Sequence, residues 1–407
     1  MKTRAEPLPE MLAFPWSMPL EDWTEGEFVS LPRGLHRHVV RFVEVTGQYY
    51  AFKELSDDLA RREYEMLDFL REEGLPTVSL VGIVTERTGD DGERLEGVLI
   101  THYLSYSVPY RMLFGGLSDA DARDRCIDAL AVLLVRAHLE GFFWGDCSLN
   151  NALFRRDAGA LRAYIVDTET AERHPQLTDG QRALDLDMAT ANVAGGLMDL
   201  AAGGRLAVDV DPAGVARSIE DRYTSLWHEL TAIEEVDGSE LWRINERLAR
   251  VNSLGFDTEE VEMSSTVAGT VRFRPTVVEE GHHKRQLESL TGIVAHENQA
   301  RRLLCAIRGY GAFLSGEEGR SIPEGVAAYR WLSERWEPAL ARVPGGLRGR
   351  MEDAEVFHEI LDEVQRSSRS AGRQVDLMEV VDSYVRDVLP TVPDARELID
   401  EVGPEVS

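Results

Sequence analysis

The sequence has few of the features that mark secreted or membrane proteins. It contains three cysteines in 407 residues, at positions 126, 147 and 305, and no two of them form a CxxC spacing. A disulfide framework is therefore not expected, and a reducing cytoplasm is the default compartment. No run of 18 or more apolar residues occurs, and the first residues lack the apolar core of a signal peptide. We therefore expect no membrane-spanning segment.

Positive charge is also scarce. The chain carries 72 acidic and 44 basic side chains, for a formal net charge of −28. This balance argues against a general attraction to nucleic acid or to an anionic membrane. Lysine is rarer still, because only Lys2, Lys53 and Lys284 accompany the arginines. Arginine does not always replace the compact charge of a lysine, so the surroundings of Lys53 are of interest.

Hydrophobic patterning predicts a mixed N-terminal region. Branched and aromatic residues between turn signals favour strands, and apolar residues at three- to five-residue spacing favour helices. In chain order, the expected elements are two strands within 38–55, a helix over 57–73, strands over 78–86 and 96–104, a long buried helix over 119–141, a loop over 142–154, a strand over 163–167 and a helix over 184–200.

The remainder of the chain is predicted to be mainly helical. Gly203-Gly204 and the polar residues after it mark a domain boundary near 205–213. A hairpin-like interruption is expected over 259–280. The predicted helices cover 212–232, 239–252, 295–314, 323–342, 354–370 and 375–389.

Five polar residues follow one another in the order that phosphoryl transfer from ATP requires. The reaction needs a strand lysine, a helix carboxylate that orients it, a loop aspartate facing the acceptor, and two further groups that hold Mg²⁺. Lys53 lies in a predicted strand and Glu63 in the next helix. Asp146 and Asn151 are five residues apart after the long helix, and Asp167 ends a predicted strand.

At these residues the chain resembles the protein-kinase-like superfamily. The spacing of Asp146 and Asn151 matches its catalytic loop, and the tripeptide AFK matches its lysine strand. The segment HLEGFFWGDCSLNNALF looks most like the lipopolysaccharide-kinase and aminoglycoside-kinase branch. Most of the chain further resembles an uncharacterised actinobacterial family in which a lipopolysaccharide-kinase-like domain precedes a domain of unknown function. That second resemblance lies in TVRFRPTVVEEGHHKRQLESLTGIVAHENQARRLL and AEVFHEIL.

The resemblance implies an α+β, bilobal kinase-like fold followed by a mainly helical domain. An N-terminal extension over 1–27 would precede the kinase-like domain over 28–205, and the helical domain would cover 210–400. Within the kinase-like domain, the small lobe would span about 28–104 and the large lobe about 105–205.

The implied activity is a cytoplasmic, ATP- and Mg²⁺-dependent transfer of the γ-phosphate to an unidentified hydroxyl acceptor. By this resemblance Lys53 grips the α- and β-phosphates and Glu63 orients Lys53. Asp146 positions and deprotonates the acceptor, while Asn151 and Asp167 hold the metal.

Further expectations concern the groups around the nucleotide. Glu65 is the alternative to Glu63 as the partner of Lys53. Gly34 is the one glycine in the segment where kinases carry a glycine-rich phosphate loop. Adenine is expected to contact backbone groups near the end of a strand, at Thr101, His102, Tyr103 and Leu104.

Some residues depart from the kinase pattern. Trp144 replaces the histidine of the HGD motif, which predicts the loss of a hydrogen-bonding group beside the catalytic loop. Residues 167–169 read Asp-Thr-Glu in place of Asp-Phe-Gly, and Glu169 could add a metal ligand. Cys147 is either a reactive thiol or, as we favour, a small side chain that fills a tight loop. His138, on the long helix, is expected to be a packing or hydrogen-bonding histidine and not a ligand. Asp185 and Asp187 are expected to act as helix caps or as anchors of the catalytic loop.

Two other classes of function remain open. The kinase-like domain could bind nucleotide without turnover, as a pseudokinase with a regulatory or scaffold role. The helical domain could be an adaptor for nucleic acid or protein through the basic segment 281–285 with Arg301 and Arg302. For that segment we favour pairing with the surrounding carboxylates, including Glu279, Glu280 and Glu288, over binding of nucleic acid.

Overall fold

The computed structural model describes residues 2–5, 9–23, 38–107, 113–115, 120–236, 247, 260–265, 271–276, 281–373 and 375–392. The chain divides into two compact units. The first comprises Met1–Arg155 and Arg162–Thr276, and the second comprises Arg156–Leu161 and Val277–Ser407. The second unit is therefore discontinuous, since a short piece from the middle of the chain belongs to it.

The first unit contains an antiparallel sheet with the strand order β1-β4-β7-β3-β2. Thr46 and Gly47 join β2 to β3 and both have positive φ, as a two-residue hairpin requires. Helix α1 follows β3 and packs on the sheet. The bounds are β1 Lys2–Ala5, β2 Val40–Val45, β3 Gln48–Leu55, α1 Asp57–Glu72, β4 Leu80–Thr85, β5 Arg87–Thr88, β6 Arg94–Leu95 and β7 Gly97–His102.

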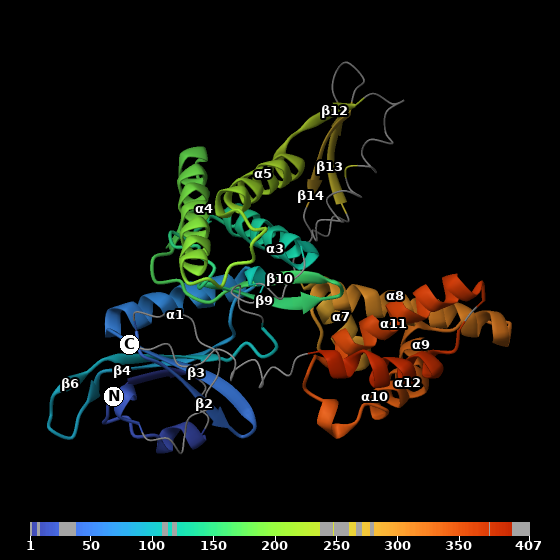
Figure 1. The fold of residues 1–407 in the computed structure, drawn as a ribbon, viewed down its shortest axis with the longest axis horizontal. Helices are drawn as coiled ribbons and strands as arrows, with labels where there is room; N and C mark the ends of the chain where they lie inside the picture. The colour runs from blue at the N-terminus through green and yellow to red at the C-terminus, as the bar shows by residue number, and fades with distance from the viewer. Residues whose placement is uncertain are drawn as a thin grey trace. The chain divides into compact units, whose positions relative to one another are not determined.

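Three long helices form the rest of the core of this unit. Helix α5 packs on both α3 and α4 (Figure 1). Short ladders join β8 to β11, β9 to β10, and β14 to both β12 and β13. The bounds are α3 Ala120–Leu139, β8 Phe142–Phe143, β9 Ala152–Asp157, β10 Ala160–Ile165, β11 Glu172–Arg173, α4 Asp179–Ala202, α5 Pro212–Thr231, β12 Glu234–Val236, β13 Glu260–Ser265 and β14 Val271–Thr276.

Residues of the predicted N-terminal extension form part of the first unit. Strand β1 adds an edge to the sheet by pairing with β4. The 3₁₀ turns Pro9–Ala13 and Leu20–Asp22 bring Leu20 and Trp23 into one apolar cluster with Phe52 of β3. The buried guanidinium of Arg87 donates to Glu54 at 2.6 Å and, through Nε, to a main-chain carbonyl of the same N-terminal segment. This segment therefore covers part of the sheet.

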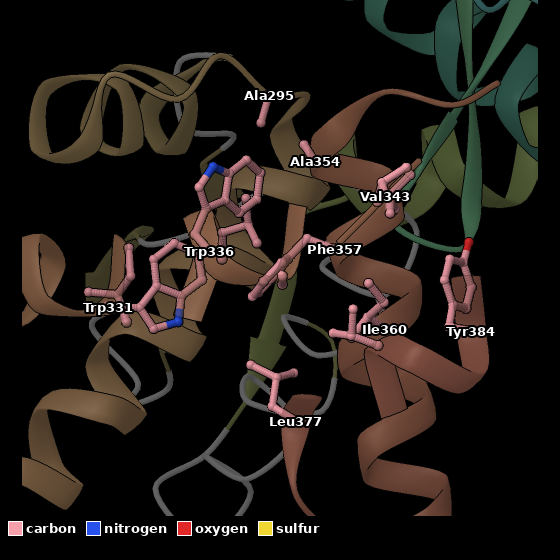
Figure 2. Packing of buried hydrophobic residues seen from close by; sticks show 14 of the residues in the cluster. Ala295, Trp331, Trp336, Val343, Ala354, Phe357, Ile360, Leu377 and Tyr384 are labelled. Carbon is pink, nitrogen blue, oxygen red and sulfur yellow. The ribbon is translucent and has the colours of Figure 1, made fainter. Parts of the chain in front are cut away.

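The second unit is helical. Its apolar core gathers three aromatic rings, Trp331, Trp336 and Phe357, whose centroids lie 5.0–5.8 Å apart (Figure 2). Large rings bury much apolar surface, and their tilted and edge-to-face contacts add to the stability of this core. The helices are α7 His282–Thr291, α8 Glu297–Glu318, α9 Glu324–Trp331, a π turn Leu332–Trp336, α10 Glu337–Ala341, α11 Asp353–Ala371 and α12 Leu377–Asp387. Short 3₁₀ turns lie at Gly345–Leu347 and Leu389–Thr391.

The structure is thus an α+β region with a sheet, followed by a helical C-terminal region. The compact units divide elsewhere than at the boundary expected near 205–213, because α5 packs on α3 and α4 of the first unit. The helix predicted over 239–252 lies outside the described residues except for Arg247, and α7 was not predicted. Among the helices described, none is long and apolar enough to cross a membrane.

Candidate active site

Lys53 lies between two carboxylates. Its Nζ atom is 3.1 Å and 3.0 Å from the two carboxylate oxygens of Glu63 on α1. The same Nζ atom is 2.9 Å from Oδ2 of Asp167. Glu63 is buried and Lys53 is largely so, whereas Glu65 is exposed on another face of α1. The structure therefore places Glu63, not Glu65, against Lys53.

Burial and charge shift the proton affinities of this pair. Burial raises the pKa of Glu63 to about 7, although the charge of Lys53 acts in the opposite direction. Burial alone would lower the pKa of Lys53, but the carboxylates of Glu63 and Asp167 outweigh it and raise that pKa. The ammonium therefore stays charged at neutral pH, and Glu63 is the group that titrates there.

Asp185 of α4 holds the loop that carries Asp146. Its carboxylate is fully buried and accepts the backbone N–H groups of Trp144 and Gly145, each at 2.8 Å. The expected supporting role of Asp185 is confirmed by these bonds. Asp187, two residues further on the same helix, is exposed and does not take this part.

His138, on α3, links Asp185 to helix α5. Its Nε2 atom lies 2.9 Å from Asp185, and its Nδ1 atom lies 2.6 Å from the hydroxyl of Tyr223 on α5. The ring is fully enclosed. As the sequence predicted, His138 is a buried hydrogen-bonding group.

Both carboxylate oxygens of Asp146 accept a side-chain amide. The Nδ2 atom of Asn151 lies 3.1 Å from Oδ2 and 2.9 Å from the main-chain oxygen of Asp146. The Nδ2 atom of Asn192, on α4, lies 2.9 Å from Oδ1. Because each carboxylate oxygen is bonded to a different side-chain amide, the plane of the carboxylate is fixed.

Asn192 was not singled out from the sequence. It is 46 positions away from Asp146 in the sequence. One signal was present, because Asp185 and Asn192 are seven residues apart. That spacing is close to two turns of a helix and places both side chains on the same face.

Trp144 corrects one expectation. The indole Nε1 donates to the main-chain oxygen of Asp167 at 2.9 Å, so the replacement of histidine does not remove a hydrogen-bonding group from this position. The Trp144 carbonyl accepts from the hydroxyl of Thr170 at 3.0 Å. The ring is fully buried. The indole of Trp144, which is larger than the imidazole of histidine, therefore links the loop of Asp146 to the segment that contains Asp167.

The Asp-Thr-Glu segment begins two residues after the end of β10, so Asp167 follows the strand that was expected to end on it. The backbone N–H of Glu169 donates to Oδ1 of Asp167 at 3.0 Å. Its side chain lies 3.2 Å from Nε2 of His38, just before β2. Arg62 of α1 donates to the carbonyl of Ala171 at 3.0 Å. These contacts tie the segment to the first sheet and to α1.

Some of the backbone groups that were expected to contact adenine already make hydrogen bonds within the protein. The backbone N–H of His102 donates to Ser79, and that of Tyr103 donates to Tyr49, both at 2.8 Å. These two N–H groups are thus engaged within the protein, while Thr101 is buried at the end of β7 and Leu104 follows in the loop. Gly34 lies outside the described residues.

Cys147 is a buried thiol. Burial raises its pKa well above the ordinary value, and the carboxylates of Asp185 and Asp146 act in the same direction. The thiolate is the reactive form of cysteine. Cys147 therefore stays protonated and fills the loop beside Asp146, as the sequence favoured.

Two members of the basic group contact carboxylates of the helical unit. His283 lies 2.9 Å from Glu297, and Arg302 lies 2.7 Å from Asp362. Arg301 donates to the side-chain oxygen of Asn298 at 3.4 Å. These carboxylates are not the ones that were expected, and of those Glu279 and Glu280 lie outside the described residues. The contacts of His283 and Arg302 agree with pairing to carboxylates.

Comparison with known proteins places a domain of unknown function in the second half of the chain. A family model described as Domain of unknown function (DUF4032) matches residues 225–389. This match agrees with the resemblance noted for the C-terminal segments. No curated protein matches the chain.

Among solved structures, the chain is similar to WaaP in complex with acyl carrier protein. The identity is 18%, the TM-score is 0.34, and the match covers 56% of this chain and 90% of that chain. This similarity is distant.

Proposed function

We propose that the protein is an ATP- and Mg²⁺-dependent phosphotransferase with a kinase-like domain, which transfers the γ-phosphate to a hydroxyl acceptor. The observation that supports this most is the position of Lys53, held by Glu63 and Asp167 in the same site. A lysine fixed in this way presents a charged ammonium to the α- and β-phosphates. The bilobal arrangement expected from the sequence is part of this proposal.

The proposed chemistry assigns one task to each residue. Asp146 accepts the proton of the acceptor hydroxyl, whose oxygen forms the new bond to the γ-phosphorus. The bond from that phosphorus to the β–γ bridging oxygen breaks, and ADP leaves. Lys53 offsets the negative charge of the phosphates, and Asn192 with Asn151 keeps the carboxylate of Asp146 in one orientation.

The donor set suits Mg²⁺. In the part of the chain that the structure describes, no three His, Cys, Asp or Glu side chains gather to hold a metal by themselves. Mg²⁺ typically keeps several waters and uses one or two protein groups together with substrate phosphates. Asn151 and Asp167 would supply those protein groups, and the metal would neutralise charge on the phosphates.

Thermal unfolding of the full chain with and without ATP and Mg²⁺ tests the binding step. A ligand at 100 times its Kd stabilises the native state by about 2.7 kcal/mol, which gives a clear shift in Tm. We expect that shift in the wild type and not in Asp167→Ala, while the exposed control Asp187→Ala keeps it. The proposal would be wrong if nucleotide gave no shift in the wild type.

A Mg²⁺-dependent shift without any phosphate transfer would instead support the regulatory alternative. The chain would then bind nucleotide as a pseudokinase.

A further inference from the structure

One hairpin carries the two proposed metal ligands at its base. Asn151 immediately precedes β9, and Asp167 comes two residues after β10. The backbone N–H of Val166 donates to the carbonyl of Asn151 at 3.0 Å, which joins the two ends of the hairpin. The relative position of Asn151 and Asp167 therefore depends on how β9 and β10 are held.

The tip of this hairpin belongs to the helical unit. The tip, Arg156–Leu161, is the short piece of chain that the second unit takes from the middle of the sequence. Ala158 and Gly159 form its turn, both with positive φ. The backbone N–H of Ala158 donates to Glu355 of α11 at 2.9 Å, and Glu355 is buried.

Asp157 is the strongest attachment of the tip. Its side chain is fully buried and lies at the N-terminus of α8. Oδ1 accepts the backbone N–H of Gln299 at 2.9 Å, and Oδ2 accepts the backbone and side-chain N–H groups of Asn298 at 3.4 and 3.3 Å. A carboxylate at this place satisfies free N–H groups of the helix and favours the positive end of its dipole.

A neighbouring side chain completes the attachment. Gln299 donates through Nε2 to Glu355 at 2.8 Å and to the carbonyl of Arg156 at 3.3 Å. The guanidinium of Arg156 lies 3.1 Å from Glu359. The tip is thus bonded to both α8 and α11. The bonds to the carboxylates of Asp157 and Glu355 are charge-assisted and therefore stronger than bonds between neutral groups.

We infer that Asp157 is a positioning residue for the proposed nucleotide site, through which the helical unit sets the arrangement of Asn151 and Asp167. The inference rests on the proposed function for the identity of the ligand, Mg²⁺ with ATP. By linkage, a contact that favours the binding arrangement is itself strengthened when the ligand binds. Binding of Mg²⁺ and ATP therefore protects the N-terminus of α8, and weakening the cap weakens binding.

The test compares Asp157→Asn with Asp376→Asn in the full-length chain. Asp376 is the control for the loss of a helix cap, because it caps α12 of the same unit through the backbone N–H groups of Met378 and Glu379, although it is exposed where Asp157 is buried. Two quantities are measured. The first is the Kd for ATP with Mg²⁺, and the second is hydrogen exchange of the 145–151 loop without nucleotide.

We expect Asp157→Asn to weaken binding about fivefold or more, the lower end of typical coupling between sites. We also expect it to speed exchange in the 145–151 loop, while Asp376→Asn changes neither quantity. If Asp157→Asn does not fold, Glu355→Gln replaces it, since Glu355 contacts the tip through Ala158. Equal effects of the hairpin variant and the control, or no effect of either, would overturn the inference.

The two proposals fail in different ways. If the wild type binds no ATP with Mg²⁺, the proposed function fails and loop exchange alone decides the role of Asp157. If binding is normal in every variant and loop exchange is unchanged, the proposed function stands and the inference fails.

Discussion

At the scale of single residues, the raised pKa of Glu63 makes stability depend on pH. Burial raises that pKa from 4.5 to about 7. Between these values the folded chain binds more protons at this site than the unfolded chain does. The free energy of unfolding from this group therefore falls as the pH rises from about 4.5 to about 7.

The variant Glu63→Gln removes this titration. We expect the wild type to lose stability relative to Glu63→Gln between about pH 5 and about pH 7, and the difference to level off above that. Urea unfolding followed by hydrogen exchange in α1 and β3 measures it at each pH. Glu65→Gln, changed at the exposed neighbour, should run parallel to the wild type. Parallel curves for Glu63→Gln as well would contradict the burial argument.

A second prediction concerns Asn192, whose side chain bonds one carboxylate oxygen of Asp146. In the contacts described it touches neither Lys53 nor Glu63. Loss of a hydrogen bond to a charged group costs about 1.5–3 kcal/mol. Asn192→Ala should therefore lower kcat roughly 10- to 100-fold while KM for ATP stays unchanged.

Thr190→Ala is the control for Asn192→Ala. Thr190 lies on the same helix, and its hydroxyl bonds to carbonyls of α4 itself. Steady-state kinetics on both variants make the comparison. A rise in KM for ATP with Asn192→Ala, at unchanged kcat, would show that the side chain serves nucleotide binding instead.

At the scale of elements, α4 acts as a support for the loop of Asp146. Asp185 is buried and accepts bonds from Trp144, Gly145 and His138. Asp185→Asn should destabilise the first unit by about 2–4 kcal/mol, because it leaves buried donors without an ionised acceptor.

Denaturation monitored by hydrogen exchange of α3 and α4 measures the effect of Asp185→Asn. Asp187→Asn, at the exposed position of the same helix, should stay within about 0.5 kcal/mol of the wild type. Similar losses in the two variants would mean that α4 is sensitive to charge in general and that the loop contacts are not the cause.

Local sequence signals predicted several elements, and tertiary contacts decided others. The helix over 57–73 could be predicted because its apolar residues recur at helical spacing, and α1 occupies nearly that range. Helix α4 begins five residues earlier than expected, since Thr178 and Gln181 form a capping box. The first three residues of β9, 152–154, were expected to belong to the loop over 142–154.

In the candidate site too, local sequence signals predicted some residues and tertiary contacts decided others. Lys53 could be singled out because lysine is so rare in this chain, and Asp146 with Asn151 by their spacing. Glu63 was preferred over Glu65 as the partner of Lys53, but the choice was left open, because it depends on which face of α1 meets the sheet. Asn192 is brought to Asp146 by the packing of α4, which no local pattern reports.

At the scale of the whole molecule, the chain combines an α+β unit with a helical unit that takes in one hairpin tip. The discontinuity could not be predicted, because it depends on buried polar partners far apart in sequence, such as Asp157 and Gln299. The boundary near 205–213 was expected from a local signal, namely the glycines and polar residues of that segment. Packing of α5 on α3 and α4 places the division later.

Transfer of the γ-phosphate itself tests the proposed phosphotransferase activity most directly. Wild type and Asp146→Asn are incubated with Mg²⁺ and γ-labelled ATP, and the label is followed onto water, onto the protein and onto a metabolite extract of the producing organism. We predict label transfer by the wild type and a loss of roughly 100-fold or more in Asp146→Asn. Equal transfer by the two proteins, or tight nucleotide binding with no transfer to any acceptor, would contradict the account.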